Sequence, residues 1–131
     1  LEEYVRKEGI QNIRFAGLVS QETLSRYYGE ADIFVLPSDM GETWGLVVNE
    51  AMNFSLPVVV SGIVGCAEDL ARHGENGFVY PTGNVGELRK CLETLLKSKD
   101  TRELFGEKSK SIVEEFSYEK DVEGIMQALS A

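Results

Sequence analysis

Residues 33–61 read IFVLPSDMGETWGLVVNEAMNFSLPVVVS, with an apolar run at each end. The runs Ile33–Leu36 and Pro57–Val60 show no polar alternation, which is typical of strands that are buried on both faces of a parallel sheet. Between them, a turn that contains glycine leads into a predicted helix from Leu46 to about Asn53. A strand, a helix and a second strand in this order predict a parallel α/β unit.

The rest of the chain extends this alternation in both directions. The further predicted elements are a strand over 12–17, a helix capped by Ser20, a short helix around 68–72, a strand over 77–80, and three helices that begin at Asn84 with Glu87, at Asp100 with Glu103, and at Ser117. We therefore predict one α/β domain over residues 1–131, with a Rossmann-like parallel sheet, helices on both faces and C-terminal helices over about 84–131. Ligands of such sheets bind beyond the carboxyl ends of the strands, where this chain has the loops 18–20, 38–45 and 61–67.

The composition is that of an ordinary globular protein. Its 131 residues suit one domain, and 22 acidic against 13 basic residues, with a net charge of −9, argue against binding to nucleic acid. No apolar run reaches the ~18 residues of a membrane-spanning helix, and the first residues show no signal peptide, so we expect a cytoplasmic location.

Cys66 and Cys91 lack metal-ligand spacing and are expected to be buried free thiols, while His73 is expected to end a helix rather than act as a catalytic base.

The segment Gly41–Met52 holds the residues with the clearest chemistry. Gly45 allows the backbone to approach a ligand at the start of a helix, whose free N–H groups and partial positive charge suit a diphosphate. Glu50 lies in the second turn among apolar residues, and such a carboxylate needs hydrogen-bond partners, which the two vicinal hydroxyls of a ribose would provide. Glu42 precedes the helix, near the rest of such a ligand. The pattern alone leaves the alternative open that Glu42 complements the helix dipole and that Glu50 is a surface residue.

An ordered set of motifs over about residues 10–90 resembles a known family. In chain order the motifs are Phe15-Ala16-Gly17, Ala31-Asp32, Pro37-Ser38, Glu42 to Leu46, Glu50-Ala51-Met52, Pro57 to Ser61, Gly65, Glu68-Asp69-Leu70, Gly74 to Gly77, Pro81 and Gly83. This set resembles the donor-binding, C-terminal domain of the family 4 retaining glycosyltransferases of the GT-B fold, also called glycosyl transferases group 1. Members of that family carry two Glu residues separated by seven positions, as Glu42 and Glu50 are here.

The resemblance implies a role for each matching residue. Glu50 would hold the ribose hydroxyls of a nucleoside diphosphate sugar, and Glu42, the catalytic candidate, would lie against the donor sugar. Donor-binding contacts, mainly through the backbone, are implied for Trp44, Gly45, Leu46 and, beside the base, Leu18. The implied reaction is transfer of a hexosyl group with retention of the anomeric configuration, with no metal and no cofactor besides the nucleotide-sugar substrate.

Departures from the family pattern concern one loop and the start of the chain. Trp44 stands where the family usually has Phe, Val64 where a glycine is frequent and Ala67 where Pro is common, and the last two affect the shape of the loop after residues 57–60. The family also has an earlier Arg and Lys that clamp the diphosphate and an N-terminal domain that binds the acceptor. This chain, which begins at Leu1, contains neither. We therefore expect the C-terminal half of a GT-B architecture, truncated on its N-terminal side and unable to transfer sugar alone.

The expected partners are a nucleotide sugar and, through the absent N-terminal domain, a glycan or lipid-linked acceptor in polysaccharide biosynthesis. Peripheral association of the full protein with a membrane stays open. The alternative function is a non-catalytic sugar-nucleotide-binding module that has the site without the acceptor domain. An epimerase of the same fold would need a different acid–base set, and a flavodoxin-like signalling domain would need an acidic cluster at its first strand and a strand-end Lys, which this sequence lacks.

Overall fold

The protein folds around a small parallel sheet in the middle of the chain. The computed structural model describes residues 1–130 and has three strands there, β1 (Phe34–Leu36), β2 (Val58–Ser61) and β3 (Gly77–Tyr80), in the order β1-β2-β3. Val59 of β2 lies between Val35 of β1 and Phe78 of β3. The three central strands of the sequence prediction are therefore confirmed, and the sheet is parallel as expected, but β1 lies at the edge of this sheet and is half-buried rather than buried on both faces.

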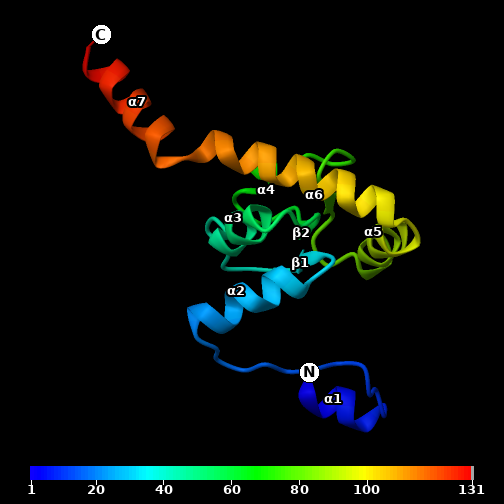
Figure 1. Ribbon diagram of the computed structural model, residues 1–131. Coiled ribbons are helices and arrows are strands. Elements are labelled where there is room, and N and C mark those ends of the chain that lie inside the picture. The colour runs from blue at the N-terminus through cyan, green and yellow to red at the C-terminus, as the bar shows by residue number, and fades with distance from the viewer. Residues whose placement is uncertain (131) are drawn as a thin grey trace.

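Helices cover both faces of this sheet (Figure 1). The helices within residues 1–130 are α1 (Glu2–Lys7), α2 (Gln21–Glu30), α3 (Leu46–Asn53), α4 (Ala67–Leu70), α5 (Val85–Lys97), α6 (Lys99–Val113) and α7 (Tyr118–Leu129), with a 3₁₀ helix η1 (Glu114–Phe116) before the last. α3 follows β1 and α4 follows β2, so each connection between parallel strands carries a helix. The predicted α/β fold, with a Rossmann-like sheet between two helical layers, is confirmed.

Strand β2 is completely buried and divides the core into two halves. Val58 and Val60 point to one side, where Met52 of α3 and apolar residues of α6 complete a cluster. Val59 points to the other side and belongs to a second cluster with Leu95 of α5. Side chains alternate along a strand, so a strand with helices on both faces needs an uninterrupted apolar run, as this one has.

Caps fix the beginnings of most of the longer helices. The side chains of Ser20, Asn84 and Ser117 accept hydrogen bonds from backbone N–H groups in the first turns of α2, α5 and α7, as predicted. The prediction that Asp100 begins α6 is wrong, because that helix starts at Lys99 and Ser98 is its cap. Ser98 lies where the chain turns out of α5, and its Oγ accepts the N–H of Thr101 at 3.1 Å.

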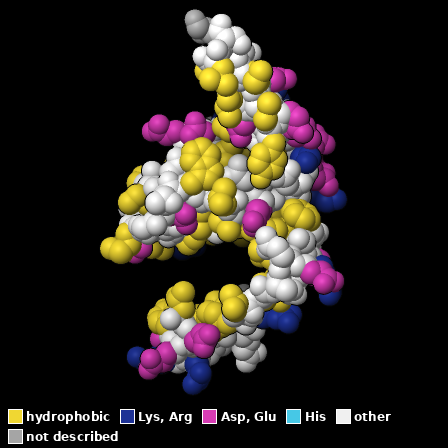
Figure 2. All heavy atoms as spheres, turned by 90° about the vertical axis from the view of Figure 1, so that its left-hand side faces the viewer, with side chains coloured by type: hydrophobic (Ala, Val, Ile, Leu, Met, Phe, Trp, Pro, Cys, Tyr) yellow, Lys and Arg dark blue, Asp and Glu magenta, His cyan; other side chains and the backbone are white. Residues whose placement is uncertain are grey.

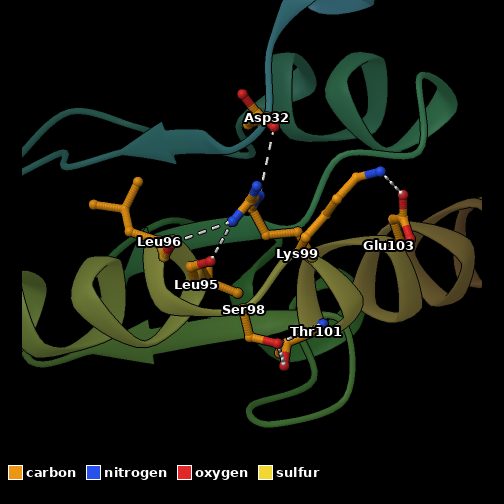
Figure 3. Close-up of polar contacts among 8 residues, drawn as sticks. Asp32, Leu95, Leu96, Ser98, Lys99, Thr101 and Glu103 are labelled. Carbon is orange, nitrogen blue, oxygen red and sulfur yellow. Dashed lines mark hydrogen bonds and ion pairs between the residues drawn. The ribbon is translucent and has the colours of Figure 1, made fainter.

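The turn from α5 to α6 is also tied to the sheet (Figure 3). Arg102 donates from Nη1 to the Leu95 carbonyl oxygen at 2.8 Å, and its Nε lies 3.4 Å from Oδ1 of Asp32, just before β1. Glu103 pairs with Lys99 at 3.0 Å rather than closing a capping box. Glu87 likewise pairs with Lys90, so the capping box predicted at Asn84 forms only as a single cap, and the box predicted at Asp100 does not form.

The strand predicted over 12–17 is wrong. These residues have no strand partner among the residues that the structure describes, and Ile13 and Phe15 stay 48% and 44% exposed. Figure 1 shows this segment between α1 and α2, away from the sheet. An alternating pattern fits an extended chain, but a strand also needs a neighbour for its N–H and C=O groups.

The last helix, α7, also extends away from the sheet (Figure 1). Its predicted apolar face is present, but that face is not covered, and Figure 2 shows apolar side chains running along this helix. The exposed fractions are between 58% and 79% for Val122, Ile125, Met126 and Leu129. Within residues 1–130, none of the helices has the length and apolar content to span a lipid bilayer.

Within residues 1–130, the two cysteines and the histidine are not part of any group of side chains that could hold a metal ion. Cys66 and Cys91 are buried free thiols, as predicted. α4 ends at Leu70, earlier than predicted, so His73 lies in the loop that follows. The Nδ1 atom of His73 is 3.1 Å from the carbonyl oxygen of Val79, which ties this loop to β3.

Candidate functional site

Two loops meet at the carboxyl ends of β1 and β2. The Oγ of Ser61, at the end of β2, donates to the carbonyl oxygen of Ser38 at 2.5 Å, and the N–H of Cys66 donates to the carbonyl oxygen of Trp44 at 2.9 Å. The backbones touch so closely that a Cβ on Gly65 would overlap the carbonyl of Thr43. The two loops therefore form one packed unit at the end of the sheet where ligands of such folds bind.

Gly45 caps α3 in a conformation that other residues rarely adopt. Its φ is 95° and its ψ is 52°, in the left-handed region. A Cβ there would lie 2.9 Å from Cγ1 of Val64 and 3.3 Å from Cδ2 of Leu36. Glycine is thus required both by the backbone angles and by the packing, and it lets α3 begin directly at Leu46. The first N–H groups of a helix lack intrahelical partners, so they are available to a ligand.

Trp44 is held against the first turns of α3. Its Nε1 donates to Oδ1 of Asn49 at 3.0 Å, and the half-buried ring packs against the core cluster that contains Val48 and Val64. Trp44, Gly45 and Leu46 therefore lie together at the start of this helix, as the sequence predicts. Their roles in donor binding stay a prediction.

Glu50 faces α2 across a cavity of about 210 Å³. Its carboxylate is partly buried, and Oε2 accepts a hydrogen bond of 3.0 Å from the hydroxyl of Tyr28. The cavity is lined by these two residues and by Gln21, Leu24, Ser25, Asn53 and Phe54. Burial, with the hydrogen bond and the charge of Glu50, raises the pKa of Tyr28 to about 12. Tyr28 therefore stays protonated and donates at neutral pH.

Glu42 lies apart from this cavity, in the loop before α3. It is half-buried and is not among the residues that line the cavity beside Glu50. Its charge acts on the thiol of Cys66: burial above all, with smaller contributions from Glu42 and Asp69, raises the pKa of Cys66 to about 11. Among residues 1–130, neither Glu42 nor Glu50 forms an ion pair. Within the described residues, two carboxylates without an ion pair therefore lie near the start of α3, Glu42 before the helix and Glu50 in its second turn.

Leu18 is a predicted site residue that does not lie with the others around the start of α3 and the cavity beside Glu50. Its side chain is fully exposed, in the loop before α2, and it does not line the cavity beside Glu50. Gln21, the first residue of α2, does line that cavity. A contact between the base and the loop around Leu18 stays a prediction.

Tyr28 and Asn49 belong to the site although the sequence analysis does not single them out. Tyr28 lies in the helix that is predicted after Ser20, and Asn49 lies in the segment Gly41–Met52. A buried tyrosine needs an acceptor for its hydroxyl and a buried carboxylate needs a donor, so the two needs match. No spacing rule connects positions 28 and 50, and only the fold shows that they meet.

Comparison with known proteins identifies the family. Residues 1–112 match the family described as glycosyl transferases group 1, and the chain belongs to this family. It is 36% identical over 106 residues to the sulfoquinovosyl transferase SQD2 of Arabidopsis thaliana, covering 79% of this chain and 21% of that protein. It is 33% identical over 107 residues to a phosphatidyl-myo-inositol mannosyltransferase of Mycobacterium leprae, covering 79% of this chain and 28% of that protein. The chain thus spans about a fifth to a third of the length of these relatives.

The fold agrees with that family. The structure of Anabaena HepE, solved in complex with UDP-glucose, superimposes with a TM-score of 0.83 at 24% identity, over 98% of this chain and 35% of that one. At this identity the likeness shows the fold alone. The architecture is that of the GT-B glycosyltransferases, as the resemblance implies.

Proposed function

We propose that this chain binds the nucleoside diphosphate sugar of a metal-independent, retaining hexosyltransferase. The observation that carries the proposal is the partly buried carboxylate of Glu50, which borders a cavity and has a single neutral hydrogen-bond donor, Tyr28, in the part of the chain that the structure describes. A carboxylate in such a setting favours a ligand that brings further hydroxyl donors. The vicinal hydroxyls of a ribose meet this need.

The diphosphate of the ligand is assigned to the start of α3. The chain is acidic, with a net charge of −9, so an anionic ligand needs local positive potential. The N-terminal amides of an eight-residue helix supply it at Leu46, directly after the left-handed Gly45. The same amides would stabilise the negative charge that grows on the departing diphosphate, without a metal ion.

Glu42 is the proposed catalytic residue on the donor-sugar side. It precedes α3 and is separated from the cavity at Glu50, as expected if the two carboxylates contact different ends of one ligand. A carboxylate beside the transferred sugar would stabilise the positive charge that develops on the sugar ring in the transition state.

Relatives support the substrate classes. Anabaena HepE was solved in complex with UDP-glucose, a nucleoside diphosphate sugar. The Mycobacterium leprae relative is named for a hexosyl group, mannosyl, and for a phosphatidyl-myo-inositol, a lipid acceptor. We therefore propose that the whole protein transfers a hexosyl group to a glycan or lipid-linked acceptor, and that the present residues contribute the donor side.

The single tryptophan of the chain provides the test. Trp44 lies at the proposed site, so its fluorescence should respond to a bound ligand. The chain is titrated with UDP, GDP and ADP, with correction for absorption by the ligand. We expect a saturable change for at least one of them, and about 10- to 100-fold weaker binding for Glu50→Ala, which removes charge-assisted hydrogen bonds.

A matched control separates the site from the general acidity of the chain. Glu22→Ala removes an exposed carboxylate from the first turn of α2 and should leave the affinity unchanged. Binding of no diphosphate up to millimolar concentration would overturn the proposed function. Equal weakening by Glu22→Ala and Glu50→Ala would overturn the assignment of Glu50.

A further inference from the structure

Tyr28 is fixed by packing on three elements. It lies near the end of α2, is 7% exposed, and clusters with Ala51 of α3 and Leu56 before β2. Its ring centroid is 6.0 Å from that of Phe34 in β1 and 5.5 Å from that of Phe54 after α3. These neighbours hold the ring, so the direction of its hydroxyl is set by the core rather than by the ligand site.

The hydroxyl of Tyr28 is aimed at one oxygen of Glu50. It donates to Oε2 at 3.0 Å, and within residues 1–130 no side chain donates a hydrogen bond to Oε1. A free glutamate side chain would turn among many rotamers, and fixing one oxygen removes most of that freedom before a ligand arrives. The second oxygen is left for a donor from the cavity of about 210 Å³ that both residues line.

The chemistry of the partner matters as much as its position. A Lys or Arg beside Glu50 would neutralise the carboxylate and compete with the hydroxyls of a ligand. A phenol donates one hydrogen bond and carries no charge while protonated, so it orients the carboxylate and leaves its negative charge in place. Tyr28 is protonated at neutral pH already with the ordinary tyrosine pKa of 10.0, and burial and the neighbouring carboxylate raise this pKa further.

We propose that Tyr28 is a positioning residue for the donor site: it holds Oε2 of Glu50 so that Oε1 is presented to the vicinal hydroxyls of the ribose. The inference rests on the proposed function and deepens it, because it makes recognition of the ribose depend on a side chain that acts through Glu50. A tyrosine at position 28 then contributes to affinity only for ligands that have these hydroxyls.

The test compares ligands with and without the two hydroxyls. The wild-type chain, Tyr28→Phe and the control Tyr27→Phe are titrated with UDP, GDP and ADP and with the corresponding 2′,3′-dideoxynucleoside diphosphates. Tyr28→Phe retains the buried ring and loses only the donor. We expect it to weaken binding of the ribose ligand about 5- to 10-fold, the scale of one lost hydrogen bond. It should leave binding of the dideoxy ligand, and binding by Tyr27→Phe, unchanged.

Each other outcome decides against the positioning role alone or against both proposals. If no diphosphate binds to the wild-type chain, the proposed function fails, and the role of Tyr28 fails with it. If the wild type binds and Tyr28→Phe binds equally well, only the positioning role is overturned. If Tyr28→Phe weakens both classes of ligand by the same factor, or lowers the melting temperature to the working range, Tyr28 is a packing residue and the inference is wrong.

Discussion

Helices α3 and α7 each have an apolar face, but that face is buried in α3 and exposed to solvent in α7. Met52 of α3 is 0% exposed, whereas Met126 of α7 is 58% exposed. α3 connects two parallel strands, so the connection itself lays the helix on the sheet, while α7 follows the 3₁₀ helix η1 and extends away from it (Figure 1). An apolar stripe therefore predicts a helix and the side that suits burial, but the topology decides whether that side is covered.

The largest expected effect on stability comes from replacing one methionine in each of the two helices by alanine. Met52→Ala should lower the free energy of unfolding by about 2–5 kcal/mol, because it leaves a cavity in the core. Met126→Ala should change it by less than about 0.5 kcal/mol, because the side chain is exposed. Urea unfolding of both variants measures the difference. Similar losses would mean that α7 is packed in solution.

Two glycines, Gly65 in the loop after β2 and Gly124 in α7, allow the same comparison between a packed and an exposed region. Gly65→Ala forces a Cβ against the carbonyl of Thr43 and should cost about 1–3 kcal/mol while moving apart the two loops of the site. Gly124→Ala meets open space within α7 and should stabilise that helix by up to about 1 kcal/mol. Melting temperatures of the two variants should therefore shift in opposite directions. A neutral Gly65→Ala would contradict the close contact of the loops.

Two buried ionisable groups, the thiol of Cys66 and the hydroxyl of Tyr28, lead us to expect that the folded protein loses stability at high pH. The pKa of Cys66 is raised from 9.0 to about 11 and that of Tyr28 from 10.0 to about 12, chiefly by burial. The folded chain keeps protons that the unfolded chain releases, so stability is complete below about pH 9 and falls as the pH rises toward 12. Urea unfolding between pH 8 and 11 should show a shallower fall for Cys66→Ala. An identical fall would contradict burial of this thiol.

The smallest effect is expected at Glu42. Glu42→Ala should leave the affinity for a bare nucleoside diphosphate within about two-fold, since Glu42 lies outside the cavity at Glu50. It should reduce the ability of the chain to distinguish among nucleoside diphosphate sugars that share a base. Competition titrations with two such sugars measure this. Equal weakening of the bare diphosphate by Glu42→Ala and Glu50→Ala would show that the two carboxylates are not divided between sugar and ribose.

Much of the fold could be predicted because its signals are local. The apolar runs around Val35 and Val59 and the caps at Ser20 and Asn84 each specify an element from neighbouring residues. The strand predicted over 12–17 failed because its formation depends on a partner strand, which a local pattern cannot supply.

In the candidate site, too, some residues could be predicted from a local motif and others could be found only from the fold. Gly45 and Glu50 could be found from a motif of adjacent residues, and the structure places them on one helix. The bond between Tyr28 and Glu50 joins two helices that are far apart in the sequence, so the fold was needed to find it. Leu18 could be named only through the resemblance, because a single exposed loop residue carries no local sign of a binding role.

The most direct test of the central claim locates the ligand residue by residue. The ¹⁵N-labelled chain is titrated with UDP-glucose and followed by ¹H–¹⁵N correlation spectra. Our account predicts shifts in the amides of residues 44–50 and in the start of α2, with α5 and α7 unaffected. Unchanged spectra up to millimolar ligand, or shifts confined to α5, α6 or α7, would contradict a donor site at the start of α3.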